Sequence, residues 1–237
     1  PVRGYLFFIT EKCRIHAACG VSQTPNVTLC ERGMLIMKGL LLKDYFAIKS
    51  SMIILLIGFV VFGFGVSFYA PPYVLMLIAS IILGQFVTTT IYSDRKYGWL
   101  KSSITFPTSK KSHVSSKYIM YALLCLLGIV VGLVLSIIIT SIRNELDTHL
   151  LLLFTCMTTT MIFMSGAILI PCYYFIKEEL SGAIGILAYG ISGVFFFGMI
   201  KLIENHVLAL TISIFTAIIL FVISWCFLCQ QIINRDI

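Results

Sequence analysis

The sequence predicts an all-α, polytopic membrane protein with six transmembrane helices, an N-terminal interfacial helix and both termini in the cytoplasm. Of the 237 residues, 59% are apolar and 11% are charged, and the mean hydropathy is +1.02. A soluble domain needs more polar surface than this, and a disordered chain has far fewer apolar residues, so both classes are excluded. The net charge of +7 is therefore assigned to the faces of a bilayer, and no nucleic-acid partner is predicted.

Residues 1–36 show neither helical nor strand periodicity, and they lack the ordered parts of a secretory signal. Glu31-Arg32-Gly33 can be encoded by a purine-rich ribosome-binding sequence that stands a short spacer before Met37. We therefore expect residues 1–36 to be translated upstream sequence, disordered or non-native, and residues 37–237 to form the six-helix domain. The alternative is a short, irregular cytoplasmic extension.

An imperfect amphipathic helix is expected before the first span. Leu41, Tyr45 and Ile48 fall at positions i, i+4 and i+7, and Leu42 and Phe46 lie beside them. This spacing predicts an interfacial helix that lies along the inner leaflet in contact with membrane lipids. The alternative is a simple N-terminal extension of the first span.

Six apolar segments approach or exceed the roughly 20 residues that a helix needs to cross a bilayer. Pro71 and Pro72 separate the first two segments, which fits a helical hairpin. In the third, Gly128 and Gly132 form a G-x-x-x-G pattern that permits close helix packing. In the fourth, Pro171 is expected to kink the helix and to leave a carbonyl that a neighbouring helix satisfies. The expected spans are residues 52–69, 73–92, 118–142, 150–176, 183–200 and 207–229.

Basic residues gather on one side of this arrangement. From Met37 onward, one side receives three lysines before the first span, six basic residues in segment 93–117, Lys177 and Arg235. The other side receives Arg143 and Lys201. The positive-inside rule then places both termini and segment 93–117 in the cytoplasm.

The expected spans contain few side chains that could take part in catalysis, metal binding or ion transfer. They lack ionisable residues at mid-membrane depth, which argues against a proton relay or a self-powered transporter. Glu178 and Glu179 are interpreted as loop residues rather than as a protease site, because they lack His or Arg partners at depth. Cys226 and Cys229 are interpreted as small apolar residues at a helix end. We predict no catalytic residue, no metal, no cofactor and no nucleotide site of the chain's own.

Hydroxyl and amide side chains do occur in two spans, over residues 85–90 and 155–160. We expect them to make interhelical hydrogen bonds, which are common in membrane bundles. The alternative is a partly polar pathway through the membrane.

Segment 93–117 is the most informative part of the chain. It combines large aromatic side chains with many basic ones, and Pro107 should break the backbone before Thr108 or Ser109 caps a short helix leading into the third span. Aromatic anchors with a basic rim are typical of a docking element for a cytoplasmic partner. The alternative is a loop that binds lipid headgroups. The candidate docking residues are Tyr97, Trp99, Lys101, Phe106, Pro107, Lys110, Lys111 and Lys117.

The stretch from Trp99 to Tyr118 resembles the connection between the second and third spans in small ABC-2-type permeases of low-GC Gram-positive bacteria. Residues 37–46 are also similar to the start of that family, which includes permeases of phenol-soluble-modulin exporters. Two features depart from the pattern: Phe106 stands where Leu is more usual, and Lys110-Lys111-Ser112 replaces a Ser-Arg-Lys-acidic run.

The resemblance implies the multi-pass membrane half of an exporter in the bacterial cell membrane. A separate ATP-binding-cassette ATPase would dock on segment 93–117, and a second permease copy or a paralogue would complete the pathway. The cargo would be an amphipathic peptide, a drug or a lipid-like molecule. The alternative is a stand-alone membrane protein, such as a bacteriocin-immunity or sensor-associated factor.

Overall fold

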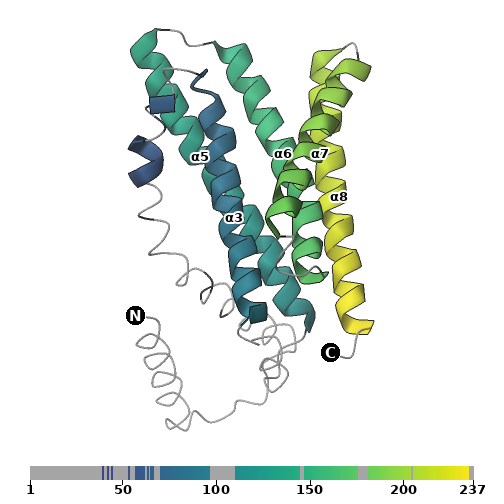
Figure 1. Cartoon of the computed structure of the whole chain (residues 1–237). Coiled ribbons are helices and arrows are strands. Elements are labelled where there is room, and N and C mark those ends of the chain that lie inside the picture. Colours follow the sequence, from purple (N-terminus) through teal and green to yellow (C-terminus); the bar gives the residue numbers. More distant parts are fainter. Residues whose placement is uncertain are drawn as a thin grey trace, which may run out of the picture. The chain divides into compact units, whose positions relative to one another are not determined.

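The computed structural model describes residues 70–96, 110–144, 147–175, 181–203 and 205–234, with scattered positions between residues 39 and 66 (Figure 1). The chain divides into two units, residues 1–35 and 36–237, and every described residue belongs to the second. The expectation for residues 1–36 therefore lies outside the described residues.

Within the described ranges the secondary structure is helical and contains no strand. Among the described residues, five helices are long and apolar enough to cross a membrane. They correspond to the second to sixth expected spans. The helices are α3 (Val74–Lys96), α5 (Lys110–Arg143), α6 (Thr148–Phe175), α7 (Ser181–Leu202) and α8 (His206–Asn234).

The first expected span lies mostly outside the described residues. Helical backbone is described at positions 53, 57–61, 63, 65 and 66. The count of six spans therefore stays a prediction. The same holds for the interfacial helix, of which only positions 39, 42 and 44 are described, again with helical backbone.

Both neighbouring helices extend into segment 93–117. α3 continues to Lys96, and α5 begins at Lys110, directly after Thr108 and Ser109, where the sequence predicts a short helix leading into the third span. Both helices continue past the apolar runs because residues 93–96 and 110–117 contain neither Gly nor Pro and bury one side, including Asp94, Val114 and Lys117. The connection between the two helices is therefore residues 97–109.

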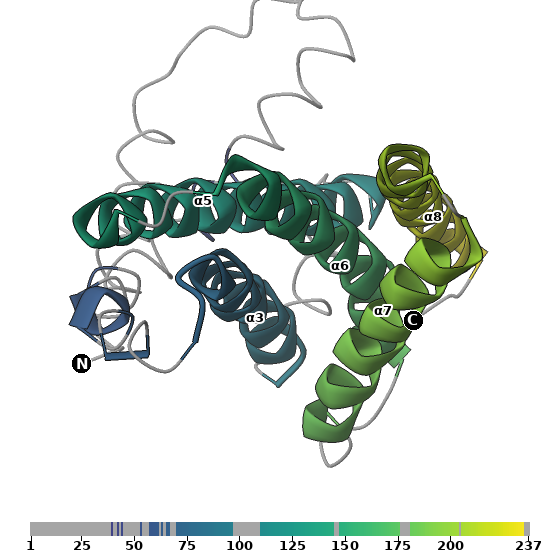
Figure 2. The ribbon, with the colours of Figure 1, turned by 90° about the horizontal axis from the view of Figure 1, so that it is seen from above.

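α6 is the central helix and packs against the four other described helices. Seen from above, α3 and α5 lie on one side of α6, and α7 and α8 lie on the other (Figure 2). We call the end where α3 and α8 finish and α5 begins the loop end. The opposite end, which carries residues 70–73, 144, 147, 203 and 205, is the turn end.

α3 and α5 pack with their backbones in contact. A Cβ atom added at Gly128 would lie 2.7 Å from the Cα of Ser80, and one added at Gly132 would collide with the Cα of Met76. The G-x-x-x-G pattern therefore lies on the seam between these two helices. In lipid, such close van der Waals packing is a main source of helix association.

α6 continues through Pro171 to Phe175. Because proline has no N–H, the carbonyl of Ala167 loses its usual partner one turn later. Ser224 Oγ of α8 donates a 2.7 Å hydrogen bond to this carbonyl. The same Oγ lies 2.9 Å from the hydroxyl oxygen of Tyr118 in α5. Tyr118 is the donor of this second hydrogen bond, because Ser224 already donates its hydroxyl hydrogen to Ala167. A neighbouring helix thus satisfies the freed carbonyl, as expected from the sequence.

The threonines of α6 differ from expectation. Thr155, Thr158, Thr159 and Thr160 all donate to carbonyls four residues earlier in the same helix. Contacts between helices are fewer: Thr160 lies 3.4 Å from Ser213 Oγ of α8, and Thr155 lies 3.6 Å from the sulfur of Met76. Most of these hydroxyls are therefore satisfied within the helix rather than between helices.

Candidate functional site

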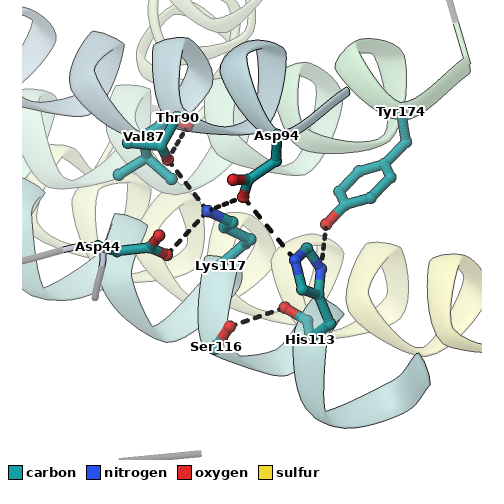
Figure 3. A network of polar contacts seen from close by, with 8 residues as sticks. All are labelled: Asp44, Val87, Thr90, Asp94, His113, Ser116, Lys117 and Tyr174. Atoms are coloured by element: carbon teal, nitrogen blue, oxygen red, sulfur yellow. Dashed lines mark hydrogen bonds and ion pairs between the residues drawn. The ribbon is translucent and has the colours of Figure 1, made fainter. Parts of the chain in front are cut away.

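A buried network of charged side chains lies at the loop end (Figure 3). Its centre is Lys117 of α5, whose side chain is 1% exposed. The Lys117 ammonium lies 2.8 Å from Asp44 Oδ2 and 2.8 Å from Asp94 Oδ2. It also donates a 3.3 Å hydrogen bond to Thr90 Oγ1. An ammonium has three hydrogens, so these three acceptors match its full donor capacity.

The positions follow from helical spacing. Thr90 and Asp94 are four residues apart on α3, and His113 and Lys117 are four residues apart on α5. Side chains at this spacing lie one above the other on one helix face. Since α3 and α5 pack tightly along their seam, the two pairs face each other. Asp44 reaches the same point from the segment before the first expected span.

A second layer of contacts supports the charged centre. His113 Nε2 lies 3.8 Å from Asp94 Oδ2, and His113 Nδ1 lies 3.3 Å from the hydroxyl of Tyr174 in α6. Ser116 Oγ donates to the carbonyl of His113 at 2.8 Å. Thr90 donates its own hydrogen to the carbonyl of Val87 at 2.8 Å, which leaves its oxygen lone pairs free to accept from Lys117.

Two buried carboxylates share the ammonium of Lys117, because Asp44 and Asp94 both lie 2.8 Å from it. Removing charges from water is costly, and that cost is recovered only when each charge has close partners. Lys117 therefore supports the burial of both carboxylates.

The network lies near the start of α5 rather than at its middle. α5 has 34 residues, so it is about 50 Å long against a hydrocarbon core of about 30 Å. Lys117 immediately precedes the long apolar part of α5, which starts at Tyr118. The network therefore lies outside the part of α5 that is apolar enough to cross a bilayer.

The structure places the expected docking residues in different environments. Lys117 is a correction: we expected it in an exposed basic rim, but it is buried because two carboxylates and a hydroxyl surround its ammonium. Lys110 begins α5, and Lys111 is exposed on it. Tyr97, Trp99, Lys101, Phe106 and Pro107 lie outside the described residues.

Of the expected interfacial residues, only Leu42 is described; its side chain is 56% exposed. Leu41, Tyr45, Phe46 and Ile48 lie outside the described residues, so their role stays a prediction. The neighbouring Asp44, which we assigned no role, is 3% exposed and belongs to the network.

Sequence reasoning missed Asp44, Asp94 and His113. The sequence holds a signal for two of these residues, Asp94 and His113. Asp94 is the lone acid of a basic stretch, and His113 stands four residues before Lys117. These two signals indicate a shared site only when the helices are extended beyond the apolar runs.

A second feature is a groove of about 440 Å³ lined by residues of α3 and α7 and by Tyr173 near the end of α6. Its lining is mostly apolar, but Gln85 Nε2 donates a 3.4 Å hydrogen bond to the hydroxyl of Tyr189 within it. Among the residues that the structure describes, no cluster of three or more His, Cys, Asp or Glu side chains could hold a metal ion.

Comparison with known proteins gives one family. The family described as ABC-2 family transporter protein matches residues 39–234, a range that contains the five described helices and the whole charged network. Neither the curated proteins nor the solved structures gave a match.

Proposed function

The chain belongs to the ABC-2 family of transporter proteins, and from this premise we propose that it exports an amphipathic peptide, a drug or a lipid-like molecule from the cell. A member of this family is a multi-pass membrane protein and the permease subunit of an ATP-binding-cassette transporter. The family match favours this function over a stand-alone immunity or sensor-associated protein, and it is the observation that carries the proposal.

The energy would come from a separate ATPase that docks on residues 97–109 in the cytoplasm. The geometry at the two ends of this connection supports the proposal. It leaves α3 at Lys96 and enters α5 at Lys110, and the backbones of these two helices are in contact at Gly128 and Gly132. A force applied to the connection would therefore act directly on a packed pair of membrane helices. The exposed cations Arg95, Lys96 and Lys111 would form the rim of the docking site.

The groove between α3 and α7 would form part of the transport pathway. Its apolar lining would accept the apolar part of an amphipathic cargo, and the Gln85–Tyr189 pair would offer hydrogen-bonding groups to its polar part. A second permease copy, or a paralogue, would complete the pathway beside this groove.

Docking can be tested with a candidate ATP-binding-cassette ATPase, sought first among the genes beside this one. The two aromatic residues of the connection are replaced together (Trp99→Ala and Phe106→Ala), and the permease is purified by a tag from cells that also express the ATPase. We expect the ATPase to co-purify with the parent chain and to be lost with the double variant, because aromatic anchors dominate most interfaces.

The matched control replaces two exposed aromatic residues on the membrane helices, Phe197→Ala and Phe215→Ala. This variant should retain the ATPase. Co-purification that survives the Trp99 and Phe106 changes would contradict docking on this connection. Absence of an ATP-binding-cassette ATPase gene from the neighbourhood would weaken the exporter proposal itself.

A further inference from the structure

We propose that the groove between α3 and α7 binds the uncharged polar group of a lipid-like cargo at mid-membrane depth, and that Gln85 is the residue that selects this group. The inference names the cargo class for a groove that the export proposal already uses, so it rests on that proposal. α3 and α7 each pack against α6, whereas the packing between α3 and α7 themselves is slight. The groove lies between them, and the hydrogen bond from Gln85 to Tyr189 bridges it.

The Gln85–Tyr189 bridge lies deep in the membrane-spanning part of the bundle. From Gln85 to Lys96 at the end of α3, the helix rises about 16 Å. This is about half of a hydrocarbon core that is about 30 Å thick. Hydrocarbon offers no hydrogen-bond partner at this depth, so a polar side chain there needs a partner within the protein or on a ligand.

The Gln85 amide has one more donor hydrogen than the described residues accept. A glutamine amide carries two N–H hydrogens and one acceptor oxygen. Here Nε2 donates to the hydroxyl of Tyr189 at 3.4 Å, and Oε1 accepts from Thr88 Oγ1 at 3.1 Å. Within the part of the chain that the structure describes, Tyr189 is the one acceptor that the amide nitrogen reaches. A hydroxyl or ester oxygen of a ligand in the groove can therefore accept the second hydrogen.

The lining of the groove disfavours a charged ligand group. None of the described residues that line it is acidic or basic. A charged group placed there would lack a counter-charge in a medium of low dielectric constant, which is costly. A neutral polar group loses less on leaving water and gains a hydrogen bond from Gln85. The groove therefore favours a cargo whose polar part is uncharged.

The groove has room for an aliphatic chain that arrives from the bilayer. Ile186 on its α7 side is 78% exposed. A Cβ atom added at Gly182 would meet no atom within 4 Å, and one added at Gly185 would meet only the Gln85 amide, at 3.8 Å. An aliphatic chain can follow this apolar lining while its polar group reaches Gln85. This favours a lipid-like cargo over an amphipathic helical peptide, whose backbone oxygens are already paired within its own helix.

The site is tested with a monoacylglycerol that carries a photoreactive diazirine in its acyl chain, added to the purified permease in lipid nanodiscs. We expect the α3 and α7 peptides that line the groove to be labelled. Gly185→Leu and Gly182→Leu fill the groove, so each should remove most of this labelling. Gly190→Leu is the matched control, because Gly190 lies on the same helix outside the lining and its added Cβ meets no atom within 4 Å. Equal labelling of these peptides in the filled variants and the control would overturn the site.

Selectivity is tested by competition between the photoreactive compound and unlabelled amphiphiles of the same chain length. A neutral monoacylglycerol should compete better than an alkyl sulfonate, which stays ionised. Gln85→Leu removes the donor and should weaken competition by the monoacylglycerol about tenfold, the effect expected when one hydrogen bond is lost. Thr89→Val, a polar-to-apolar change on α3 outside the lining, should leave competition unchanged. Equal or better competition by the sulfonate, or displacement by an amphipathic helical peptide alone, would overturn the inference.

Binding is measured in the permease alone, so its outcome is separate from that of the export proposal. Selective labelling of the groove in a chain that recruits no ATPase would support the binding site and contradict export. Unselective labelling in a chain that does recruit an ATPase would overturn the inference and leave the export proposal intact.

Discussion

The two ends of the helix bundle use charged and polar side chains in different ways. At the loop end, Lys117 is buried and links Asp44, α3 and α5. At the turn end, Asp147 is exposed and caps the start of α6. Its Oδ1 accepts hydrogen bonds from the N–H groups of His149 and Leu150, at 2.9 Å and 3.4 Å. Tyr73 accepts a 2.9 Å hydrogen bond from the N–H of Asp147 and so ties the start of α3 to the start of α6.

This difference concerns what holds each end of the bundle together. The turn end is held by helix capping and by short connections, which keep neighbouring helices in fixed register. The loop end is held by a charged network whose members come from four segments. The loop end therefore depends on pairing between charges, whereas the turn end depends on hydrogen bonds to the backbone. Three substitutions test this difference.

The largest effect is expected at Lys117. Replacing it with Met leaves two buried carboxylates without their cation and should lower the free energy of unfolding by about 3–5 kcal/mol. Thermal unfolding in detergent would measure the loss. Lys201→Met, an exposed change at the turn end, should stay within about 0.5 kcal/mol of the parent. If both variants unfold alike, the network does not stabilise the loop end.

The second effect concerns the seam that joins the two ends. A methyl group at Gly132 would collide with the backbone of Met76, so Gly132→Ala should destabilise the bundle by about 1–3 kcal/mol. Gly190→Ala is the control, because no atom lies within 4 Å of its added Cβ. Unfolding temperatures compare the two variants, and an equally stable Gly132→Ala would argue against the close packing.

The smallest effect is expected at the turn end. Asp147→Ala removes the N-cap of α6 and should cost about 1 kcal/mol, whereas Asp147→Asn keeps a side-chain acceptor and should cost little. Hydrogen exchange of the first turn of α6 would report the change directly. Faster exchange in both variants alike would show that the charge, rather than the cap, holds this turn.

The helices of the bundle could be predicted because a span must be apolar over a known length. The second to sixth spans follow from this rule, and the Gly128–Gly132 pattern and the carbonyl freed by Pro171 follow from local backbone chemistry. Each of these features depends on residues close together in the sequence.

The charged network could not be predicted in the same way. Asp44 and Lys117 are 73 residues apart, and their contact depends on how the helices pack. The short helix predicted after Thr108 or Ser109 agrees with the start of α5 at Lys110, but the burial of Lys117 on that helix depends on packing between segments. His113 and Tyr174 meet only because the start of α5 lies beside the end of α6.

The orientation of the bundle is the most direct test of this account, because the loop end must face the cytoplasm for an ATPase to engage it. In a cysteine-free chain, Lys111→Cys and Lys201→Cys place single exposed thiols at the loop end and the turn end. A membrane-impermeant maleimide added to intact cells should label Lys201→Cys and should reach Lys111→Cys only after the cells are permeabilised. Labelling of Lys111→Cys in intact cells would contradict the account.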